Sequence, residues 1–364
     1  MKIAIMGAGL SGLSCAITLE QNGISPTIFE KRNQIGDRFV NGEILLSIMS
    51  RPIKDDIAYL SQKHGIFLRP TGNINKFILH SENETGVITG NLGFTNIRGR
   101  DKDSFECQLA QQVKSKIFFN SKQTYEHLLK DFSHVILATG DGSYATKIQP
   151  YEQDLTVSLK GFTIVGDFNR YTIEAWLNND IAPKGYSYLI PLSEKEANIV
   201  VAYPDYPENS TVEIGDKLDI LHSLVCKNLD QDLKITDSFQ IKNYIIGKCH
   251  SPRIGNTLFV GNCFGSIMPF LGFGQMSAIL TGVYAAYDLL GKGQYEDLTK
   301  RLRSSYNNSL VIRRSMEKLD NSKFDLLVKG LNGPLGNKLF TASRVDFLKA
   351  ASYLLRPLVA VTKG

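Results

Sequence analysis

Three glycines near the start of the sequence have the spacing of a dinucleotide-binding turn. They form the pattern Gly7-x-Gly9-x-x-Gly12 directly after a short apolar run. In such a motif the first glycine permits a tight turn, the second lets the backbone approach a pyrophosphate, and the third lets a helix pack closely on a strand. Glu30 ends the next apolar segment, where a carboxylate can bind ribose hydroxyls and disfavours a 2′-phosphate. The alternative is a strand-to-helix turn that binds no ligand.

The elements around these glycines are predicted in the order that the chemistry requires. Residues 2–6 form an apolar strand, residues 10–22 a helix, and residues 26–30 a second strand. The helix therefore starts at the glycine turn, and its N-terminus faces the phosphate charge. This strand-helix-strand unit predicts dinucleotide binding, but the fingerprint alone does not distinguish NAD from FAD.

The rest of the chain alternates between two kinds of pattern. Residues 134–139 and 256–262 are predicted as buried strands, and 275–291 as a long helix rich in small residues. Residues 155–206 contain short strands separated by turns, which is typical of an antiparallel sheet. Residues 66–100 suggest further short strands. Other helices are predicted at 52–64, 103–114, 121–131 and 211–228.

Composition favours an ordinary folded protein. Of 364 residues, 43% are hydrophobic and 21% are charged. The cysteines are scattered, odd in number and never spaced as C-x-x-C, which argues against structural zinc and for a reducing, cytoplasmic location. No stretch reaches the roughly 20 uninterrupted apolar residues of a membrane span, and residues 1–12 lack the parts of a secretion signal. The basic residues form no aromatic-interleaved platform, so we expect no nucleic-acid partner.

Charge is unevenly distributed along the chain. Residues 301–364 contain 12 Lys and Arg against 4 Asp and Glu, a balance of +8, whereas the whole chain has a formal net charge of +5. A basic tail interleaved with apolar runs, as at 347–356, is compatible with peripheral contact with an anionic membrane. The alternative is a helical cap whose apolar face packs on the core and whose basic face is solvated.

Four further segments match, in order, those of one flavoprotein family. Residues 101–109 (DKDSFECQL) are similar to D-R-x-x-F-D-x-x-L, residues 138–143 (ATGDGS) to an A-D-G segment, residues 260–262 (VGN) to G-D, and residues 269–275 (PFLGFGQ) to P-x-x-G-x-G. On these motifs the chain resembles, over nearly its whole length, the geranylgeranyl reductase family of FAD-dependent oxidoreductases, within the aromatic-hydroxylase-like flavoproteins. The structural alternatives are a tight turn at 138–143 and a close helix contact at 269–275.

The resemblance implies roles for particular side chains. Lys102 stands where an arginine reaches the ribityl-pyrophosphate region, and Asn262 stands where an acid binds the ribityl chain. An asparagine can still accept a hydrogen bond through its carbonyl oxygen. The cysteine-glycine motif that family members often carry falls at 36–42, where this chain has no cysteine and Arg38 is left to contact flavin or phosphate.

A fifth segment concerns the substrate. Residues 182–191 (APKGYSYLIP) resemble the prenyl reductase stretch Y-x-W-x-F-P, with Tyr188 in place of tryptophan. Alternate residues of a strand point to the same face, so Tyr186 and Tyr188 can wall a pocket beside the flavin, with Phe270 as a further candidate. Alternating aromatics are also what any half-buried sheet displays.

The resemblance implies an enzyme whose chemistry is that of its cofactor, since we find no Ser-His-Asp, Cys-His or metal-ligand spacing. The implied reaction is reduction of carbon–carbon double bonds in a polyprenyl or geranylgeranyl lipid. With one glycine fingerprint in the chain, the electron donor is a visiting NAD(P)H or a reductase or ferredoxin. The alternatives are an NAD(P)H-dependent monooxygenase that hydroxylates an aromatic substrate, a flavin halogenase, and a non-catalytic flavoprotein.

These arguments together predict an α/β fold. A Rossmann-type FAD-binding domain is expected at 1–150 and 247–300, an inserted antiparallel-sheet substrate domain at 151–246, and a helical basic C-terminal region at 301–364. The predicted FAD contacts are Gly7, Gly9, Leu10, Ser11, Gly12, Glu30, Lys31, Arg38, Lys102, Thr139, Gly140, Asp141, Asn262, Gly272, Phe273, Gly274 and Gln275. The predicted pocket residues are Tyr186, Tyr188 and Phe270, and neither a catalytic side chain nor a metal ligand is predicted.

Overall fold

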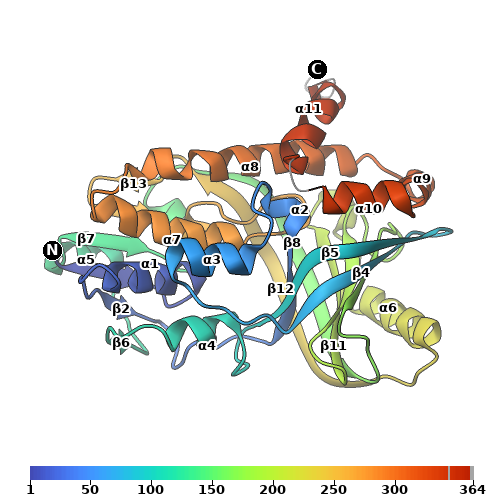
Figure 1. The fold of residues 1–364 in the computed structure, drawn as a ribbon, viewed down its shortest axis with the longest axis horizontal. Helices are drawn as coiled ribbons and strands as arrows, with labels where there is room; N and C mark the ends of the chain where they lie inside the picture. Colours follow the sequence, from blue (N-terminus) through green and yellow to red (C-terminus); the bar gives the residue numbers. More distant parts are fainter. Residues whose placement is uncertain (343–344, 361–364) are drawn as a thin grey trace.

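The framework of the protein is a pair of β-sheets, seen in a computed structural model that describes residues 1–342 and 345–360 (Figure 1). The first sheet has the order β13-β14-β7-β1-β2-β6, and its neighbours are parallel except for β13 at one edge. Its strands are β1 (Ile3–Met6), β2 (Thr27–Phe29), β6 (Ile117–Phe118), β7 (His134–Leu137), β13 (Arg253–Ile254) and β14 (Thr257–Phe259).

Two helices pack tightly together against this parallel sheet. They are α1 (Leu10–Glu20) and α7 (Gln275–Leu289). The hydroxyl of Ser14 donates a 3.0 Å hydrogen bond to the carbonyl of Ile279. Gly282 lies so close to α1 that a Cβ there would stand 2.0 Å from the Ser11 carbonyl oxygen. The small residues of α7 thus let two segments far apart in sequence close one core around the glycine turn.

The second sheet has eight strands in the order β12-β8-β11-β10-β9-β4-β5-β3. Its neighbours are antiparallel except for the parallel pair β4 and β9. Its strands are β3 (Asn41–Leu46), β4 (Gly72–His80), β5 (Thr85–Arg98), β8 (Tyr151–Val165), β9 (Thr172–Trp176), β10 (Tyr186–Pro191), β11 (Glu196–Pro204) and β12 (Lys234–Cys249). The helix α6 (Ile214–Leu229) covers one face of β8 and β11.

The antiparallel sheet is built from two separate parts of the chain. Sequence analysis placed it at 151–246 and expected only short strands at 66–100. Instead, β4 and β5 are long and, with β3, extend the same sheet beyond β9. Residues 41–98 lie inside the range predicted for the FAD-binding domain, yet β3, β4 and β5 pair with one another or with β9 in the antiparallel sheet. Pairing between distant strands leaves no mark in local periodicity, so the sequence alone does not reveal it.

Capping residues shorten several of the predicted helices. The Asp55 side chain accepts a 2.8 Å hydrogen bond from the Ala58 N–H, so α3 begins at Asp56 rather than near residue 52. Ser104 and Thr124 cap the next two helices in the same way. These short helices are α2 (Ser47–Ser50), α3 (Asp56–His64), α4 (Phe105–Ala110) and α5 (Tyr125–Asp131), with 3-10 turns η1 (Ala145–Lys147), η2 (Pro207–Asn209) and η3 (Gly261–Cys263).

A run of helices closes the molecule on one side. In Figure 1 the long helix α8 runs above both sheets, and α11 projects beyond it. The helices are α8 (Tyr295–Met316), α9 (Asn321–Leu331), α10 (Pro334–Thr341) and α11 (Phe347–Ala360). A polar contact joins α10 to β5, since the Asn337 side chain accepts a 2.7 Å hydrogen bond from the Thr89 N–H.

The predicted α/β fold class with a helical C-terminal region is confirmed. Within the part of the chain that is described, no helix is long and apolar enough to cross a membrane.

Candidate active site

A large cavity of about 1730 Å³ connects the two sheets. One end lies at the carboxyl ends of β1, β2 and β7, where Gly7, Glu30 and Thr139 line it. The other end lies between the antiparallel sheet and α8 to α11. A ligand pocket at the carboxyl end of a parallel sheet is the expected place for a dinucleotide.

The three fingerprint glycines serve different physical needs. Gly7 has φ +118°, and a Cβ there would lie 2.1 Å from the Ala138 carbonyl oxygen. A Cβ on Gly12 would lie 2.0 Å from the Gly7 carbonyl oxygen. A Cβ on Gly9 would meet nothing within 4 Å and would enter the cavity. Gly7 and Gly12 therefore allow the turn to form, while Gly9 leaves room for a ligand.

The start of α1 is open toward the cavity. No side chain caps it at Gly9, and Leu10 and Ser11 line the cavity. The first N–H groups of a helix lack intrahelical acceptors and carry partial positive charge. This helix end can therefore bind an anionic group such as a pyrophosphate.

Glu30 joins the glycine turn to the end of β2. Its Oε2 accepts a 2.8 Å hydrogen bond from the Ala8 N–H, and its Oε1 accepts one of 2.9 Å from the Arg32 N–H. An ionised carboxylate has about four acceptor positions, so two stay available at the cavity wall. The carboxylate thus holds the turn in place and can still bind ribose hydroxyls.

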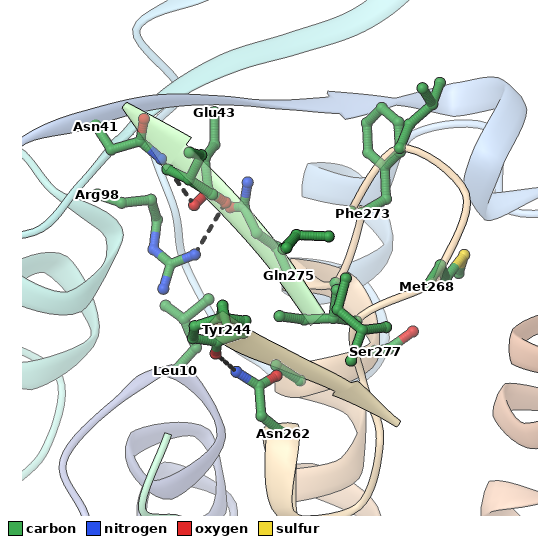
Figure 2. A pocket seen from close by; sticks show the side chains of 18 of the residues that line it. Leu10, Asn41, Glu43, Arg98, Tyr244, Asn262, Met268, Phe273, Gln275 and Ser277 are labelled. Carbon is green, nitrogen blue, oxygen red and sulfur yellow. Dashed lines mark hydrogen bonds and ion pairs between the residues drawn. The ribbon is translucent and has the colours of Figure 1, made fainter. Parts of the chain in front are cut away.

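Asn262 links three segments at the cavity wall (Figure 2). Its Nδ2 donates to the Gly140 carbonyl oxygen at 2.7 Å and to the hydroxyl of Tyr244, which itself donates to Gly140 at 2.9 Å. Both amide hydrogens are thereby used, so the side chain offers a ligand only its carbonyl oxygen. Neighbouring Asp141 also lines the cavity, with its carboxylate accepting a 3.0 Å hydrogen bond from the Ser143 N–H.

A buried ion-pair network lies beside this cluster (Figure 2). Arg98 contacts Glu106 at 2.8 Å and Glu43 at 3.0 Å. Burial alone would raise the pKa of Glu106, but the adjacent Arg98 guanidinium holds that pKa below its usual range. Burial, followed by repulsion from Arg98, lowers the pKa of Arg38. Two cations and two carboxylates therefore balance one another at this wall of the cavity.

Lys102 is not where the resemblance implied. Its side chain is exposed before α4 and does not line the cavity. Arg38 and Arg98 line it instead, so these two are the basic residues that the structure offers to this part of a cofactor. Gly12 also lies outside the lining, because its role is the packing contact with Gly7.

The loop before α7 is held from two sides. Tyr186 donates a 2.6 Å hydrogen bond to the Leu271 carbonyl oxygen, and the Phe270 N–H donates at 2.8 Å to the buried Ser309 hydroxyl on α8. A Cβ on Gly272 would approach only the Tyr186 hydroxyl, at 3.8 Å. The loop thus presents open backbone to the cavity, and α7 begins there without a side-chain cap. Phe270, Gly272, Phe273, Gly274 and Gln275 all line the cavity.

Tyr186 and Tyr188 form one wall of the cavity. Their rings stack with centroids 5.9 Å apart on the same face of β10. Tyr186 uses its hydroxyl to hold the loop, whereas the Tyr188 hydroxyl has no hydrogen-bond partner among the described residues. Burial raises the pKa of both hydroxyls above the ordinary value. Both tyrosines therefore stay protonated at neutral pH.

The residues present fit an FAD molecule. Three buried polar atoms at the cavity wall have no hydrogen-bond partner among the residues that the structure describes: Arg38 Nε, Asn41 Oδ1 and Gln275 Oε1. Buried polar atoms are rarely left unpaired, so each calls for a ligand atom or water. Open space above Gly9 and Gly140, where a Cβ would meet nothing within 4 Å, adds room for an extended cofactor.

Comparisons with known proteins agree with this geometry. The family model for NAD(P)-binding Rossmann-like domains matches residues 5–43. A digeranylgeranylglycerophospholipid reductase of Methanocaldococcus jannaschii is 22% identical over 369 residues, covering 92% of this chain and 91% of the relative. The crystal structure of a geranylgeranyl bacteriochlorophyll reductase-like protein from Thermoplasma acidophilum superposes with a TM-score of 0.74 at 16% identity, covering 98% and 97% of the two chains.

The chain has the fold of FAD-dependent oxidoreductases and is similar over nearly its whole length to two proteins of the geranylgeranyl reductase kind. This similarity agrees with the resemblance predicted from the motifs and with the enzyme class and cofactor that the resemblance implied. The same fold also occurs in flavoproteins of other activities. The flavin-dependent brominase Bmp2 has a TM-score of 0.68 at 13% identity, covering 100% of this chain and 98% of that one, and flavin-dependent monooxygenases share the fold as well.

Sequence reasoning missed several residues of this flavoprotein's cavity. Glu43, Arg98 and Tyr244 lie on β3, β5 and β12 and meet only through the fold. The one available signal was Glu106, which falls inside the quoted 101–109 motif. Within the described residues, no cluster of His, Cys, Asp and Glu could hold a metal ion.

Proposed function

We propose that this flavoprotein reduces carbon–carbon double bonds of a polyprenyl or geranylgeranyl lipid. The observation that supports this most is the apolar half of the cavity. Its wall includes Phe77 and Leu79 of β4, Ile173 of β9, Leu177 directly after β9, and Met316 of α8. Such a wall excludes water and suits a long hydrocarbon chain rather than a small polar ring.

The polar and apolar halves of the cavity are continuous, so a prenyl chain in one can reach a cofactor in the other. Tyr186, Tyr188 and the 269–275 loop lie between the two halves as lining residues. When bound, reduced FAD supplies the hydride for each double bond. The protein's task is to bind the chain, orient the double bond at the loop and keep water out.

Each double bond that is reduced takes up one hydride and one proton. We assign the proton to Tyr188 Oη, because this hydroxyl lies at the cavity wall and no other described residue forms a hydrogen bond with it. After donation, the tyrosinate is reprotonated from solvent once the product has left the cavity. The oxidised cofactor then needs an external two-electron donor, for which we propose NAD(P)H or a reductase or ferredoxin.

The test is reduction in detergent. Holoprotein reduced with dithionite is mixed with detergent-solubilised prenyl lipids of several chain lengths, and the masses of the products are measured by mass spectrometry. We expect products heavier by pairs of hydrogen atoms. Unchanged lipid at every chain length would refute the proposal. NADPH-dependent oxygen uptake with an aromatic product heavier by one oxygen would assign a monooxygenase instead.

A substitution inside the apolar half makes this test specific. Ala175 lines the cavity on β9 between Ile173 and Leu177, so Ala175→Phe should obstruct long chains while leaving short ones reactive. Flavin absorbance should be unchanged. As a matched control, Ala182→Phe is placed at a buried alanine outside the cavity lining; it tests whether added volume in this sheet region alone lowers activity.

A further inference from the structure

The apolar half of the cavity opens between the last three helices. Leu327 of α9, Leu339 of α10 and Leu358 of α11 each line the cavity and are also exposed, by 41%, 36% and 58%. Residues that belong to both the wall and the outer surface mark an opening. The three helices therefore surround one mouth, which leads into the part of the cavity proposed to hold the prenyl chain.

These helices expose several large apolar side chains. Leu335 on α10 is 68% exposed, and Tyr353 and Leu354 on α11 are 75% and 74% exposed. The opposite side of α11 packs inward through Leu348 and Ser352, so α11 has large apolar side chains both toward the protein and away from it. Contiguous exposed apolar surface on a folded protein marks an interaction site.

Cations accompany these apolar side chains. Lys338, Lys349 and Arg356 are exposed on α10 and α11, within the 301–364 region whose formal charge is +8. Each basic residue near an anionic lipid surface adds to the attraction. Exposed leucine and tyrosine next to lysine and arginine is the chemistry of a helix that lies in a membrane interface.

The cavity itself provides no place for an anionic head group at its apolar end. The Lys and Arg residues that line it are Lys31, Arg32, Arg38, Arg98, Lys122 and Lys147, and within the described chain none of them is on α8 to α11. A phosphate drawn into the apolar half would lose its hydration without gaining a counter-ion. A polar or anionic head must therefore remain outside the mouth.

We propose that the exposed surface of α9, α10 and α11 docks on an anionic lipid bilayer, and that the lipid enters the cavity tail first while its head stays at the interface. This inference rests on the proposed function for the identity of the tail. Docking itself is a property of the surface and can be measured without turnover.

Vesicle sedimentation tests the docking. Holoprotein is mixed with vesicles of phosphatidylcholine alone, or of phosphatidylcholine with phosphatidylglycerol, and the bound fraction is measured. We expect binding to the anionic vesicles, weaker binding to the neutral ones, and partial release by salt. The double variant Tyr353→Ser/Leu354→Ser should bind at least tenfold less; both residues are exposed and outside the cavity lining, so its flavin absorbance should be unchanged.

The matched control is Phe67→Ser/Ile220→Ser, which removes two apolar side chains that are 65% and 49% exposed elsewhere. In Figure 1, α6, which carries Ile220, lies on the far side of the antiparallel sheet from α10. This control should bind vesicles like the wild type. The proposal would be overturned if both double variants lost vesicle binding equally, or if the wild type did not bind vesicles. A dimer, seen by sedimentation velocity, that only the α11 variant dissociates would also overturn it.

Activity separates this proposal from the previous one. On detergent-solubilised prenyl lipid, the α11 variant should turn over like the wild type, and it should be slower only on lipid presented in vesicles. Normal vesicle binding without reduction of any prenyl lipid in detergent would leave the docking intact and refute the proposed function. Reduction of prenyl lipid in detergent without any vesicle binding would support the proposed function and refute the docking.

Discussion

The side-chain amide of Asn262 donates a 2.7 Å hydrogen bond to the carbonyl oxygen of Gly140. This contact explains a departure from the family motif, in which an acid occupies the position of Asn262. A carboxylate cannot donate a hydrogen bond, so an acid at this position would place its oxygen next to the Gly140 carbonyl oxygen, and two acceptors would repel each other. Here the Gly140 carbonyl accepts from both the Asn262 amide and the Tyr244 hydroxyl, and that hydroxyl accepts from the same amide.

Asn262→Asp should therefore weaken FAD binding, even though it restores the family residue. Loss of the hydrogen bond and the new repulsion should raise the Kd on the order of tenfold. Titration of apoprotein with FAD by calorimetry measures this. Tyr244→Phe is the control, because it removes one partner of the same cluster without adding charge, and should have a smaller effect. FAD binding by Asn262→Asp that equals or exceeds the wild type would contradict this account.

Gly9→Val should abolish FAD binding without unfolding the protein. The added side chain would project into open cavity space rather than into protein atoms. Gly12→Ala makes the contrasting case, since its Cβ would lie 2.0 Å from the Gly7 carbonyl oxygen and should destabilise the fold itself. Absorbance near 450 nm and the Tm of the apoprotein distinguish them. A Gly9→Val protein that still carries flavin would show that the cofactor does not approach this turn.

The local parts of the site could be predicted from sequence, and the distant ones could not. The glycine turn and Glu30 lie within a single strand-helix-strand unit, so spacing alone specifies their geometry. Arg98, Glu43 and Glu106 come from separate elements, and alternation in a strand does not tell which strand will be its neighbour. Lys102 was misplaced because a motif match gives sequence order but not the direction of a side chain.

The C-terminal helices show a different limit of sequence reasoning. Membrane contact and packing on the core had been treated as alternatives for this region. Leu348 and Ser352 pack inward while Tyr353 and Leu354 are exposed. The single helix α11 therefore packs on the core and still has apolar surface available for membrane contact. Apolar periodicity could not separate the two, because α11 is apolar on more than one side.

Tyr188→Phe should lower kcat on the order of 10²-fold if its hydroxyl supplies the proton. The ring remains, so KM and flavin absorbance should change little. Tyr186→Phe is the matched variant: it removes the hydrogen bond to the Leu271 carbonyl and should act on the 269–275 loop, raising KM or the Kd for FAD. Single-turnover reduction of a prenyl lipid measures both. Wild-type kcat in Tyr188→Phe would exclude that hydroxyl as the donor.

Asp56 should make the stability of the protein depend on pH. Burial raises the pKa of this carboxyl to about 7, and the 3.0 Å hydrogen bond from Ser50 partly offsets this rise. Its Oδ1 has no hydrogen-bond partner in the described part of the chain. The folded state therefore holds a proton that the unfolded state releases near pH 4, and stability falls as the pH rises from about 4 to about 7. Since one pKa unit corresponds to about 1.4 kcal/mol, the loss amounts to at most about 4 kcal/mol.

Asp56→Asn should remove this dependence and raise the Tm at pH 8 above that of the wild type. Urea unfolding at pH 5 and pH 8 provides the comparison. Asp103→Asn, at an exposed position, should leave the wild-type dependence in place. A wild-type protein that is equally stable at both pH values, or an Asp56→Asn protein that is less stable at pH 8, would count against a buried protonated carboxyl.

The parallel pairing of β4 with β9 also constrains how the chain acquires its structure. It joins residues 76–80 to residues 172–176, so the hairpin made early in synthesis has an unpaired edge until the middle of the chain has left the ribosome. Exposed strand edges promote association between chains. Splitting the gene between these two strands should therefore yield two insoluble halves, and co-expression of both should be needed to recover soluble material.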